Sequence, residues 1–199
     1  MATPWDGNAV GWQRRGMATP WENGVLTRVR TTGYVEYATH GVSGHDSVGM
    51  SHSMAKVAIH LVFATQDRKR FLDDQVRSPL HAYMITVLRN LRSPVLAINS
   101  VEDHVHILFE LGRTVALSSA VEGIKRTSSR WIKTQGTAFA RFGWQSGYGA
   151  FAVSESNTAA VRRYIERQRA HHQRLTFEDE YRAFLKRHGV AYDEAHLWS

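Results

Sequence analysis

The chain has 199 residues, 43% of them hydrophobic and 22% charged, which is the composition of an ordinary globular protein with one domain and a short addition. It has no cysteine, so disulfides, thiolate metal sites and thiol catalysis are excluded, and no apolar run reaches the ~18 residues of a membrane-spanning helix. The formal net charge is +7, and residues 1–49 contribute none of the excess because their four basic and four acidic side chains cancel. We therefore expect a cytoplasmic protein without a membrane segment, whose basic region in 50–199 attracts a polyanion such as nucleic acid, although charge alone is weak support for this.

The first 50 residues differ from the rest. They are rich in Gly and Thr, have no sustained apolar period, and contain a five-residue repeat at Met1–Trp5 and Met17–Trp21. This composition predicts a disordered or atypical N-terminal extension over 1–50, with at most one stray strand between Arg28 and Tyr37, before a domain over 51–199. We expect the extension to be dispensable.

The pattern sharpens after Lys56. A short apolar run over 57–64 is typical of a buried strand. Asp73 or Asp74 caps a predicted helix that reaches about Leu91. Two strands that pair as a hairpin, 95–101 and 104–111, are expected next.

The second half repeats the alternation. A helix from Thr114 or Ser118 to about Lys133, ended by Gly136, precedes a strand over 149–153. Two further helices are predicted over 157–172 and 177–188, and Leu197 and Trp198 in the tail are expected to dock. The β-α-β-β-α-β order predicts an α+β, ferredoxin-like fold: an antiparallel sheet with two helices on one face and C-terminal helices appended. The other face is left for a site, a partner or a second subunit.

His104-Val105-His106 begins one of the predicted strands. Residues i and i+2 of a strand point to the same face, so both imidazoles project together while Val105 points to the core. Two imidazoles can bind one divalent cation but do not complete its ligand shell. An ordinary pair of strand histidines is the alternative.

The helix predicted over 157–172 carries Tyr164 and, one turn later, Gln168. A glutamine carbonyl oxygen can ligate Mg²⁺ or Mn²⁺, and a tyrosine beside such a cation is a nucleophile toward a phosphodiester. A purely structural tyrosine is the alternative. His171 and His172 follow and are interpreted as a surface pair, with contact to DNA or to the metal's ligand shell as the alternative.

These residues together resemble the single-tyrosine HUH transposases, the small insertion-sequence transposases and their REP-associated relatives. The resemblance covers about residues 52–199 and rests on Ile59–Thr65, Glu102–Leu108, Trp144–Ser154, Val161–His172 and the tail Tyr192–Trp198. The combination is specific: an HUH pair on a strand, followed by Tyr-x-x-x-Gln on a helix. Nothing in the first 50 residues contributes to it.

The resemblance implies a metal-dependent DNA transposase that cleaves hairpin-bearing single-stranded DNA and transfers strands. His104, His106 and Gln168 match the metal ligands, and Tyr164 matches the nucleophile that forms a 5′-phosphotyrosine link. Mg²⁺ or Mn²⁺ is the implied cofactor, and a homodimer, whose active site can combine residues of both subunits, is the implied assembly. The implied setting is a bacterial cytoplasm, with the protein on the nucleoid when bound to DNA.

Basic and aromatic residues suit a DNA ligand. A one-sided stripe on the helix before Gly136 is expected to contact phosphates, and we add two arginines near Tyr164; the candidates are Lys125, Arg126, Arg130, Lys133, Arg163 and Arg167. Trp131, Trp144 and Tyr148 are candidates for stacking on unpaired bases, with core packing as the alternative.

Two other functions remain open. One is a domesticated hairpin-DNA-binding protein with little or no cleavage activity. The other is a metal-dependent hydrolase of small phosphoesters, which would need carboxylate ligands, for which Glu102 and Asp103 are the nearest candidates. Dependence of catalysis on Tyr164 separates the transposase from the hydrolase, and cleavage itself separates it from the binding protein.

Overall fold

The computed structural model describes residues 27–29, 35–37, 54–172, 176–194 and 197. Within the N-terminal segment it contains two short strands, β1 (Thr27–Val29) and β2 (Val35–Tyr37), which pair antiparallel. The sequence suggested a single strand there. The rest of the predicted extension over 1–50 lies outside the described residues.

A four-stranded antiparallel sheet organises the domain. Its strands are β3 (Ala58–Ala64), β4 (Val95–Ser100), β5 (His104–Glu110) and β6 (Gly149–Val153). They lie in the order β4-β5-β3-β6, so β3 and β5 are central. The expected ferredoxin-like α+β arrangement is confirmed.

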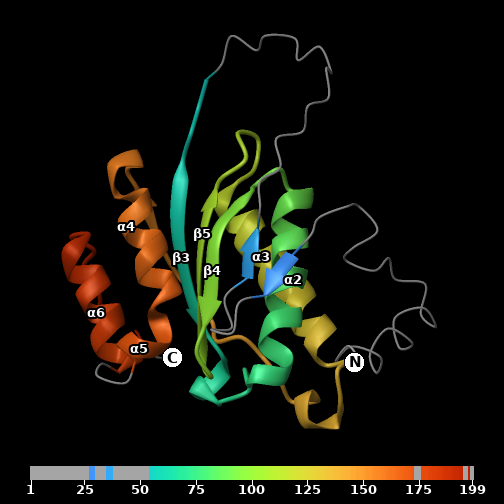
Figure 1. Ribbon diagram of the computed structural model, residues 1–199. Coiled ribbons are helices and arrows are strands. Elements are labelled where there is room, and N and C mark those ends of the chain that lie inside the picture. The colour runs from blue at the N-terminus through green and yellow to red at the C-terminus, as the bar shows by residue number, and fades with distance from the viewer. Residues whose placement is uncertain (1–26, 30–34, 38–53, 173–175, 195–196, 198–199) are drawn as a thin grey trace, which may run out of the picture.

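Helices α2 (Asp74–Asn90) and α3 (Leu117–Ile132) pack on one face of the sheet (Figure 1). Alternate residues of the central strands point into this layer, including Leu61, Ile107 and Phe109, none of which is exposed. Asp73 caps α2 as predicted, because its Oδ1 accepts hydrogen bonds from the backbone N–H groups of Gln75 and Val76 at 3.0 Å. The predicted caps of α3 are wrong: Ala116 occupies that position without a side-chain cap, and the helix ends before Gly136.

Helices α4 (Glu155–Glu166), α5 (Gln168–His171) and α6 (Phe177–Arg187) cover the other face (Figure 1). Two apolar clusters hold them there: Phe177, Phe184 and Leu185 pack on β3 and β6, and Ile165 packs on β4 and β5. The face that the sequence analysis left open is therefore occupied by the chain's own C-terminal helices. Leu197 packs against this layer, while the predicted docking of Trp198 lies outside the described residues.

The single helix predicted over 157–172 is broken at Arg167, whose φ and ψ are −95° and 9°. Asn99 on β4 explains the break, because its Nδ2 donates to the carbonyl oxygens of Ile165 at 2.9 Å and Glu166 at 3.4 Å. Those carbonyls would otherwise accept bonds from the next helical turn. Tyr164 consequently lies in the last turn of α4 and Gln168 opens α5.

The remaining elements are short. Two 3₁₀ turns span Gln66–Arg68 and Thr137–Phe139. Helix α6 ends as predicted at Gly189, whose φ of 63° allows the backbone N–H of Val190 to reach the carbonyl of Leu185 at 3.0 Å. In the part of the chain that the structure describes, no helix combines the length and apolarity needed to cross a membrane.

Candidate metal centre and tyrosine site

Strand β5 places His104 and His106 on the face covered by α4–α6, as the alternation predicts. Because β5 is a central strand with neighbours on both sides, the side chains of His104 and His106 are only 1% and 0% exposed. A buried imidazole loses its hydration, so each of its nitrogen atoms needs a partner.

The Nδ1 atoms of both histidines have partners inside the protein. His104 Nδ1 lies 2.7 Å from Asp103 Oδ1, and His106 Nδ1 lies 2.9 Å from His60 Nε2 on β3. Burial, together with the neighbouring His106 and His188, holds the pKa of His60 well below its usual value, so His60 is neutral and its Nε2 can accept a hydrogen bond from His106 Nδ1–H. In both cases the Nε2 atom is left as the ligand atom, which is the arrangement by which outer partners orient metal-binding histidines.

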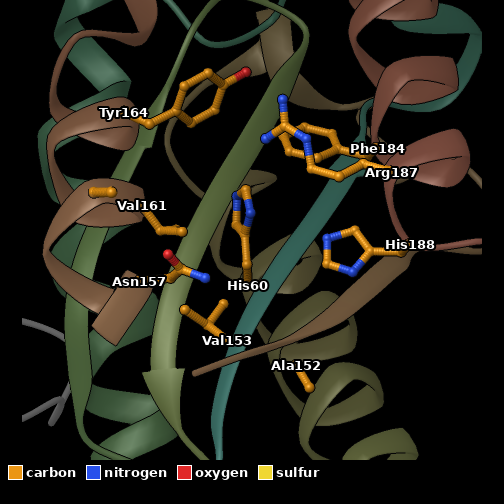
Figure 2. A pocket seen from close by; sticks show the side chains of 10 residues that line it. His60, Ala152, Val153, Asn157, Val161, Tyr164, Phe184, Arg187 and His188 are labelled. Atoms are coloured by element: carbon orange, nitrogen blue, oxygen red, sulfur yellow. The ribbon is translucent and has the colours of Figure 1, made fainter. Parts of the chain in front are cut away.

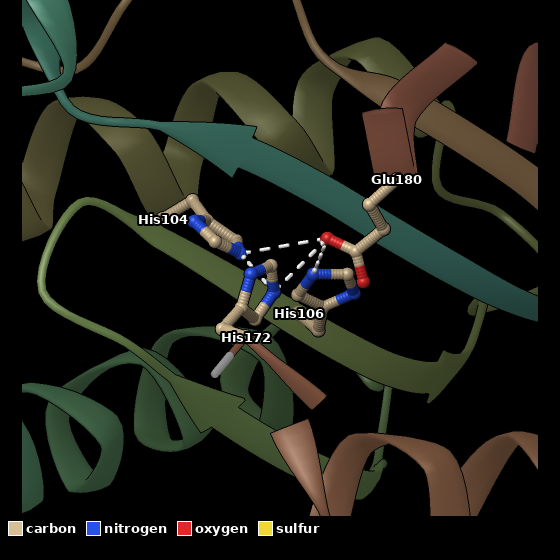
Figure 3. A group of neighbouring side chains, drawn as sticks. All are labelled: His104, His106, His172 and Glu180. Atoms are coloured by element: carbon tan, nitrogen blue, oxygen red, sulfur yellow. Dashed lines mark hydrogen bonds and ion pairs between the residues drawn. The ribbon is translucent and has the colours of Figure 1, made fainter. Parts of the chain in front are cut away.

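Two residues from the C-terminal layer meet these Nε2 atoms (Figure 3). His172 Nε2 lies 3.0 Å from His104 Nε2, and Glu180 Oε2 lies 3.6 Å from His104 Nε2, 3.4 Å from His106 Nε2 and 3.1 Å from His172 Nε2. One ligand atom from each of the four residues lies within 4.8 Å of the others. The predicted surface position of His172 is wrong, since its side chain is 11% exposed and belongs to this cluster; the side chain of His171 lies outside the described residues.

The carboxyl groups around the cluster have opposite pKa shifts. Burial raises the pKa of Glu180 to about 7, against the opposing effect of His104, and Asp103 adds to the increase. Burial also acts to raise the pKa of Asp103, but its hydrogen bond to His104 and the charges of His104, His172 and Arg68 outweigh burial and lower it. Asp103 is thus an ionised partner of His104, and Glu180 is a buried carboxyl group without a neutralising hydrogen bond.

This donor set fits a divalent metal ion. Neither carboxylate oxygen of Glu180 accepts a hydrogen bond within the described residues, although three imidazoles surround it. Three Nε2 atoms and one carboxylate oxygen that converge on one point are typical ligands of a first-row transition metal. His104, His106, His172 and Glu180 are therefore the residues that could hold a cation.

Gln168, the predicted third ligand, is 0% exposed. Neither its amide oxygen nor its amide nitrogen has a hydrogen-bond partner among the described residues. His172 follows one helical turn later, and its backbone N–H donates to the Gln168 carbonyl at 3.0 Å, so the two side chains leave α5 on the same side. A buried amide with no hydrogen-bond partner among the described residues calls for an explanation, and a ligand role is one.

Tyr164 lies beside the cluster within the same chain. Its ring centroid is 5.9 Å from that of His106 and 6.3 Å from that of His60. Figure 2 shows the ring projecting from α4 toward Phe184 and Arg187 on α6. Tyr164, Arg187, Asn157 and His188 contribute to the lining of a pocket of about 460 Å³ between these helices.

The predicted DNA-contacting residues divide between the two faces of the sheet. The stripe on α3 lies in the layer opposite the histidine cluster. Its member Lys125 is partly buried, and its ammonium group donates to the carbonyl oxygens of Gln145 at 2.6 Å and Gly147 at 2.7 Å, while burial lowers its pKa. Arg126 lies 3.6 Å from Glu122, whereas Arg130 and Lys133 are exposed.

The two arginines predicted near Tyr164 are placed differently. Arg163 and Arg167 are exposed at the end of α4, on the same side of the sheet as the cluster, and neither has an ion-pair partner among the described residues. Arg169, by contrast, pairs with Asp74. Arg163 and Arg167 thus supply positive charge on the side of the sheet that carries Tyr164, and Arg187 supplies it across the pocket.

The three aromatic candidates for base stacking differ in exposure. Trp131 is buried and stacks on Tyr83 with ring centroids 5.4 Å apart. Trp144 is half-buried against Phe63 and Phe142, and its Nε1 donates to Ser128 Oγ at 2.9 Å. Only Tyr148, at 40% exposure, presents its ring to solvent, so the core-packing alternative holds for both tryptophans.

The carboxylates expected for a phosphoester hydrolase are not in the cluster. Asp103 contacts the Nδ1 atom of His104, on the side of the ring away from the cluster, and Glu102 Oε2 lies 3.7 Å from Arg70 Nη2. The residue that sequence reasoning missed is Glu180. Its spacing from Phe177 and Phe184 places it on the apolar stripe of α6, and a carboxylate on such a stripe was the signal for it.

Comparisons with known proteins give the family. The model of the family described as "Transposase IS200 like" matches residues 53–168, more than half of the chain. A candidate transposase from Deinococcus radiodurans R1 is 24% identical, with a TM-score of 0.48, over 59% of this chain and 95% of its own. A REP-associated tyrosine transposase bound to a REP hairpin is 18% identical, with a TM-score of 0.46, over 62% of this chain and 74% of its own. No curated protein matches significantly.

The two structural likenesses are remote, so the family rests on the sequence match. That match contains β3, the HUH pair on β5, Tyr164 and, as its last residue, Gln168. It stops before His172 and Glu180. By this match the chain belongs to the IS200-like transposase family.

Proposed function

We propose that the protein is a single-tyrosine transposase that cuts and rejoins single-stranded DNA through Tyr164. The observation that carries the proposal is the position of Tyr164 beside His106 of the same chain, with the ring centroids 5.9 Å apart. A nucleophile next to a candidate cation site is the arrangement that phosphoryl transfer requires, because this chemistry depends on positioning and charge neutralisation.

In the first step the Tyr164 oxygen attacks the scissile phosphorus. The P–O bond to the 3′-oxygen breaks, the phenol gives up its proton, and the departing 3′-oxygen takes one up. The products are a 5′-phosphotyrosine and a free 3′-hydroxyl. A second 3′-hydroxyl then attacks the phosphotyrosine and releases Tyr164, so bond energy is retained and no ATP is needed.

His104, His106 and Gln168 are proposed to hold Mg²⁺ or Mn²⁺, with Asp103 and His60 fixing the imidazoles. When bound, such a cation polarises the phosphoryl oxygens and offsets their charge. Tyr164 supplies the nucleophile, and the pocket between α4 and α6 holds the DNA strand next to it.

The proposed substrate is single-stranded DNA that carries a hairpin, bound by a homodimer. Arg163 and Arg167 would contact phosphates close to the cleavage site, since they lie on the same side of the sheet as Tyr164. The α3 stripe of Lys125, Arg126, Arg130 and Lys133 faces away and would contact only a more distant part of the DNA. Tyr148 would stack on an unpaired base.

The test is formation of a covalent adduct. Full-length protein and labelled single-stranded DNA from the flanks of the gene are incubated with Mn²⁺ or Mg²⁺ and separated on a denaturing gel. We expect an adduct with wild type, none with Tyr164→Phe or His106→Ala, and a normal adduct with Tyr192→Phe, a matched control at an exposed tyrosine.

Each alternative has its own outcome. An adduct that survives in Tyr164→Phe would refute the assignment of the nucleophile. Tight hairpin binding without an adduct in either metal would favour a domesticated binding protein. Hydrolysis of small phosphoesters that is unchanged in Tyr164→Phe would favour the hydrolase.

A further inference from the structure

We propose that His172 and Glu180 are additional ligands of the cation, so that a segment beyond the family match completes the metal site and makes it selective for Mn²⁺ or a similar transition metal over Mg²⁺. The proposal rests on the proposed function in that the same cation serves Tyr164. Its ligand set, however, stands on geometry of its own.

The first observation is convergence. The Nε2 atoms of His104, His106 and His172 and one oxygen of Glu180 come from β5, the end of α5, and α6, yet lie within 4.8 Å of one another. His104 and Glu180 are 1% and 2% exposed. A carboxyl group rarely occupies such a buried position unless it is paired or ligates a metal.

The second observation is the surroundings of the Glu180 carboxyl group. Glu180 accepts no hydrogen bond from a described residue, although the His172 Nε2 atom lies 3.1 Å from its Oε2. Two ring nitrogens, His104 Nε2 and His172 Nε2, face each other at 3.0 Å. These atoms suit a cation placed among them, because neutral imidazole nitrogens and a carboxylate are all electron-pair donors.

The third observation is that the inner imidazoles are already oriented to donate through Nε2. His104 Nδ1 lies 2.7 Å from Asp103 Oδ1, where it can donate a hydrogen bond, and His106 Nδ1 lies 2.9 Å from His60 Nε2. Each ring therefore already has the outer partner that its ligand state requires. Outer partners of this kind orient metal-binding histidines, which distinguishes the arrangement from a chance contact between histidines.

The identity of the preferred cation follows from the donor atoms. Mg²⁺ prefers oxygen ligands and keeps much of its water. The affinity of imidazole nitrogen is lowest for Mg²⁺, higher for Mn²⁺ and highest for the later transition metals. Adding His172 raises the nitrogen content of the site, and adding Glu180 supplies a negative charge. We thus expect Mn²⁺ or Co²⁺ to bind in the absence of DNA under conditions in which Mg²⁺ binds weakly.

The experiment measures metal binding without DNA. Full-length protein is freed of metal with a chelator and titrated calorimetrically with Mn²⁺, Co²⁺ and Mg²⁺, and the visible spectrum of bound Co²⁺ is recorded. The variants are Glu180→Gln and His172→Gln, with Glu155→Gln as the control, since Glu155 is a surface carboxylate on α4.

We expect Glu180→Gln and His172→Gln each to weaken Mn²⁺ binding about tenfold or more, because even the outer partners of metal ligands are worth 10- to 100-fold. Both variants should change the Co²⁺ spectrum, and Glu155→Gln should behave as wild type. Thermal melting in chelator distinguishes a defect in ligation from a defect in folding. Glu180→Gln removes a buried carboxyl group whose oxygens accept no hydrogen bond from a described residue, so the metal-free variant should be as stable as wild type or more so.

The proposal is overturned if both variants bind Mn²⁺ with the affinity of Glu155→Gln, or if wild type binds Mg²⁺ as tightly as Mn²⁺. These outcomes are independent of the adduct test. A wild-type protein that binds Mn²⁺ through His172 and Glu180 but forms no adduct would refute the proposed function and leave the ligand set intact. If wild type forms the adduct but neither substitution affects metal binding, the ligand set is refuted and the proposed function stands.

Discussion

The two faces of strand β5 are equally buried but are stabilised in opposite ways. Val105, Ile107 and Phe109 point toward α2 and α3 and are 0% exposed in an apolar core. His104 and His106 point toward α4–α6 and are just as inaccessible. The first set gains free energy by leaving water, whereas the second loses hydration that only specific partners can replace.

A second buried histidine sharpens this contrast. His81 on α2 lies in the apolar layer, and its Nε2 is 2.9 Å from Ser100 Oγ. Nearby Arg77 pairs with Asp74 at 2.5 Å and donates to the Leu72 carbonyl at 2.8 Å. That charge has a carboxylate and a carbonyl as partners, while the Glu180 oxygens face three imidazoles and accept no hydrogen bond from a described residue. Burial of a titratable group is thus ordinary in this fold, and a buried carboxyl group among three imidazoles, with no hydrogen bond from a described residue, is what distinguishes the candidate site.

The largest expected effect on stability comes from the apolar face. Phe109→Ala should lower the free energy of unfolding by about 3–5 kcal/mol, because it removes a fully buried ring and leaves a cavity. Urea denaturation in the presence of chelator measures the decrease. The folded fraction should still bind Mn²⁺ with wild-type affinity.

His106→Gln on the opposite face is the counterpart. It should abolish tight Mn²⁺ binding and change the stability of the metal-free protein by no more than about 1.5 kcal/mol, the ordinary net value of one hydrogen bond. Equal losses of stability in Phe109→Ala and His106→Gln would contradict the contrast between the faces.

The next effect is a pH dependence carried by His81. Burial, reinforced by the charge of Arg77, lowers the pKa of His81 to about 3, against an ordinary value of 6.5. Between these values the unfolded chain binds a proton that the folded chain does not, so the free energy of unfolding falls as the pH falls through this range. One such group contributes up to ~1.4 kcal/mol per pH unit.

Urea denaturation at several pH values between about 6 and 4, in chelator, measures the slope. His81→Gln should retain a hydrogen bond to Ser100 and have a shallower slope than wild type. Identical slopes would show that other buried groups carry the acid sensitivity.

The strands and the first two helices could be predicted from the sequence because their signals are local. Apolar runs and the Asp73 cap do not depend on distant residues, and the i, i+2 rule alone places His104 and His106 on one face. The break at Arg167 could not be predicted, because Asn99, whose side chain bonds to the end of α4, is remote in the chain. Periodicity over 157–172 favours one continuous helix.

The site was predictable only where its residues share an element or a family motif. His60, His172 and Glu180 approach the HUH pair from three other elements, so their contacts depend on how the C-terminal helices pack over the sheet. The same packing places the basic stripe of α3 on the opposite side of the sheet from the candidate site. A helical wheel shows which residues share one face of a helix, but not on which side of the sheet the helix packs. The face that the sequence analysis left for a site, a partner or a second subunit carries the candidate site, covered by the chain's own C-terminal helices.

A smaller effect concerns the charged residues of the two helical layers. Replacing Arg163 and Arg167 together by Gln should weaken binding of single-stranded DNA, because fewer phosphates are neutralised. The slope of log affinity against log salt should then become shallower by about 0.7 for each phosphate that the variant no longer neutralises. Fluorescence anisotropy at several salt concentrations measures it.

Arg130 and Lys133, exposed on α3, form the matched pair. With a short unpaired oligonucleotide, their replacement by Gln should leave the slope close to that of wild type, because they lie on the opposite side of the sheet from Tyr164. If the salt slope changes more in the Arg130/Lys133 variant than in the Arg163/Arg167 variant, the DNA strand binds on the side of the sheet that carries α2 and α3.

The smallest effect tests how firmly α6 presents Glu180. Thr176 caps this helix: its Oγ1 accepts a hydrogen bond from the backbone N–H of Asp179 at 3.2 Å and donates to Asp179 Oδ2 at 2.7 Å. Thr176→Ala should lower the free energy of unfolding by about 1 kcal/mol in chelator, and Thr176→Ser, which keeps the hydroxyl, should recover most of it. If Glu180 is a ligand, saturating Mn²⁺ will raise the stability of both variants by nearly the same amount as wild type, because the bound ion itself holds the helix in place. A Thr176→Ala protein that loses Mn²⁺ binding altogether would instead mean that the cap, and not the cation, determines where Glu180 lies.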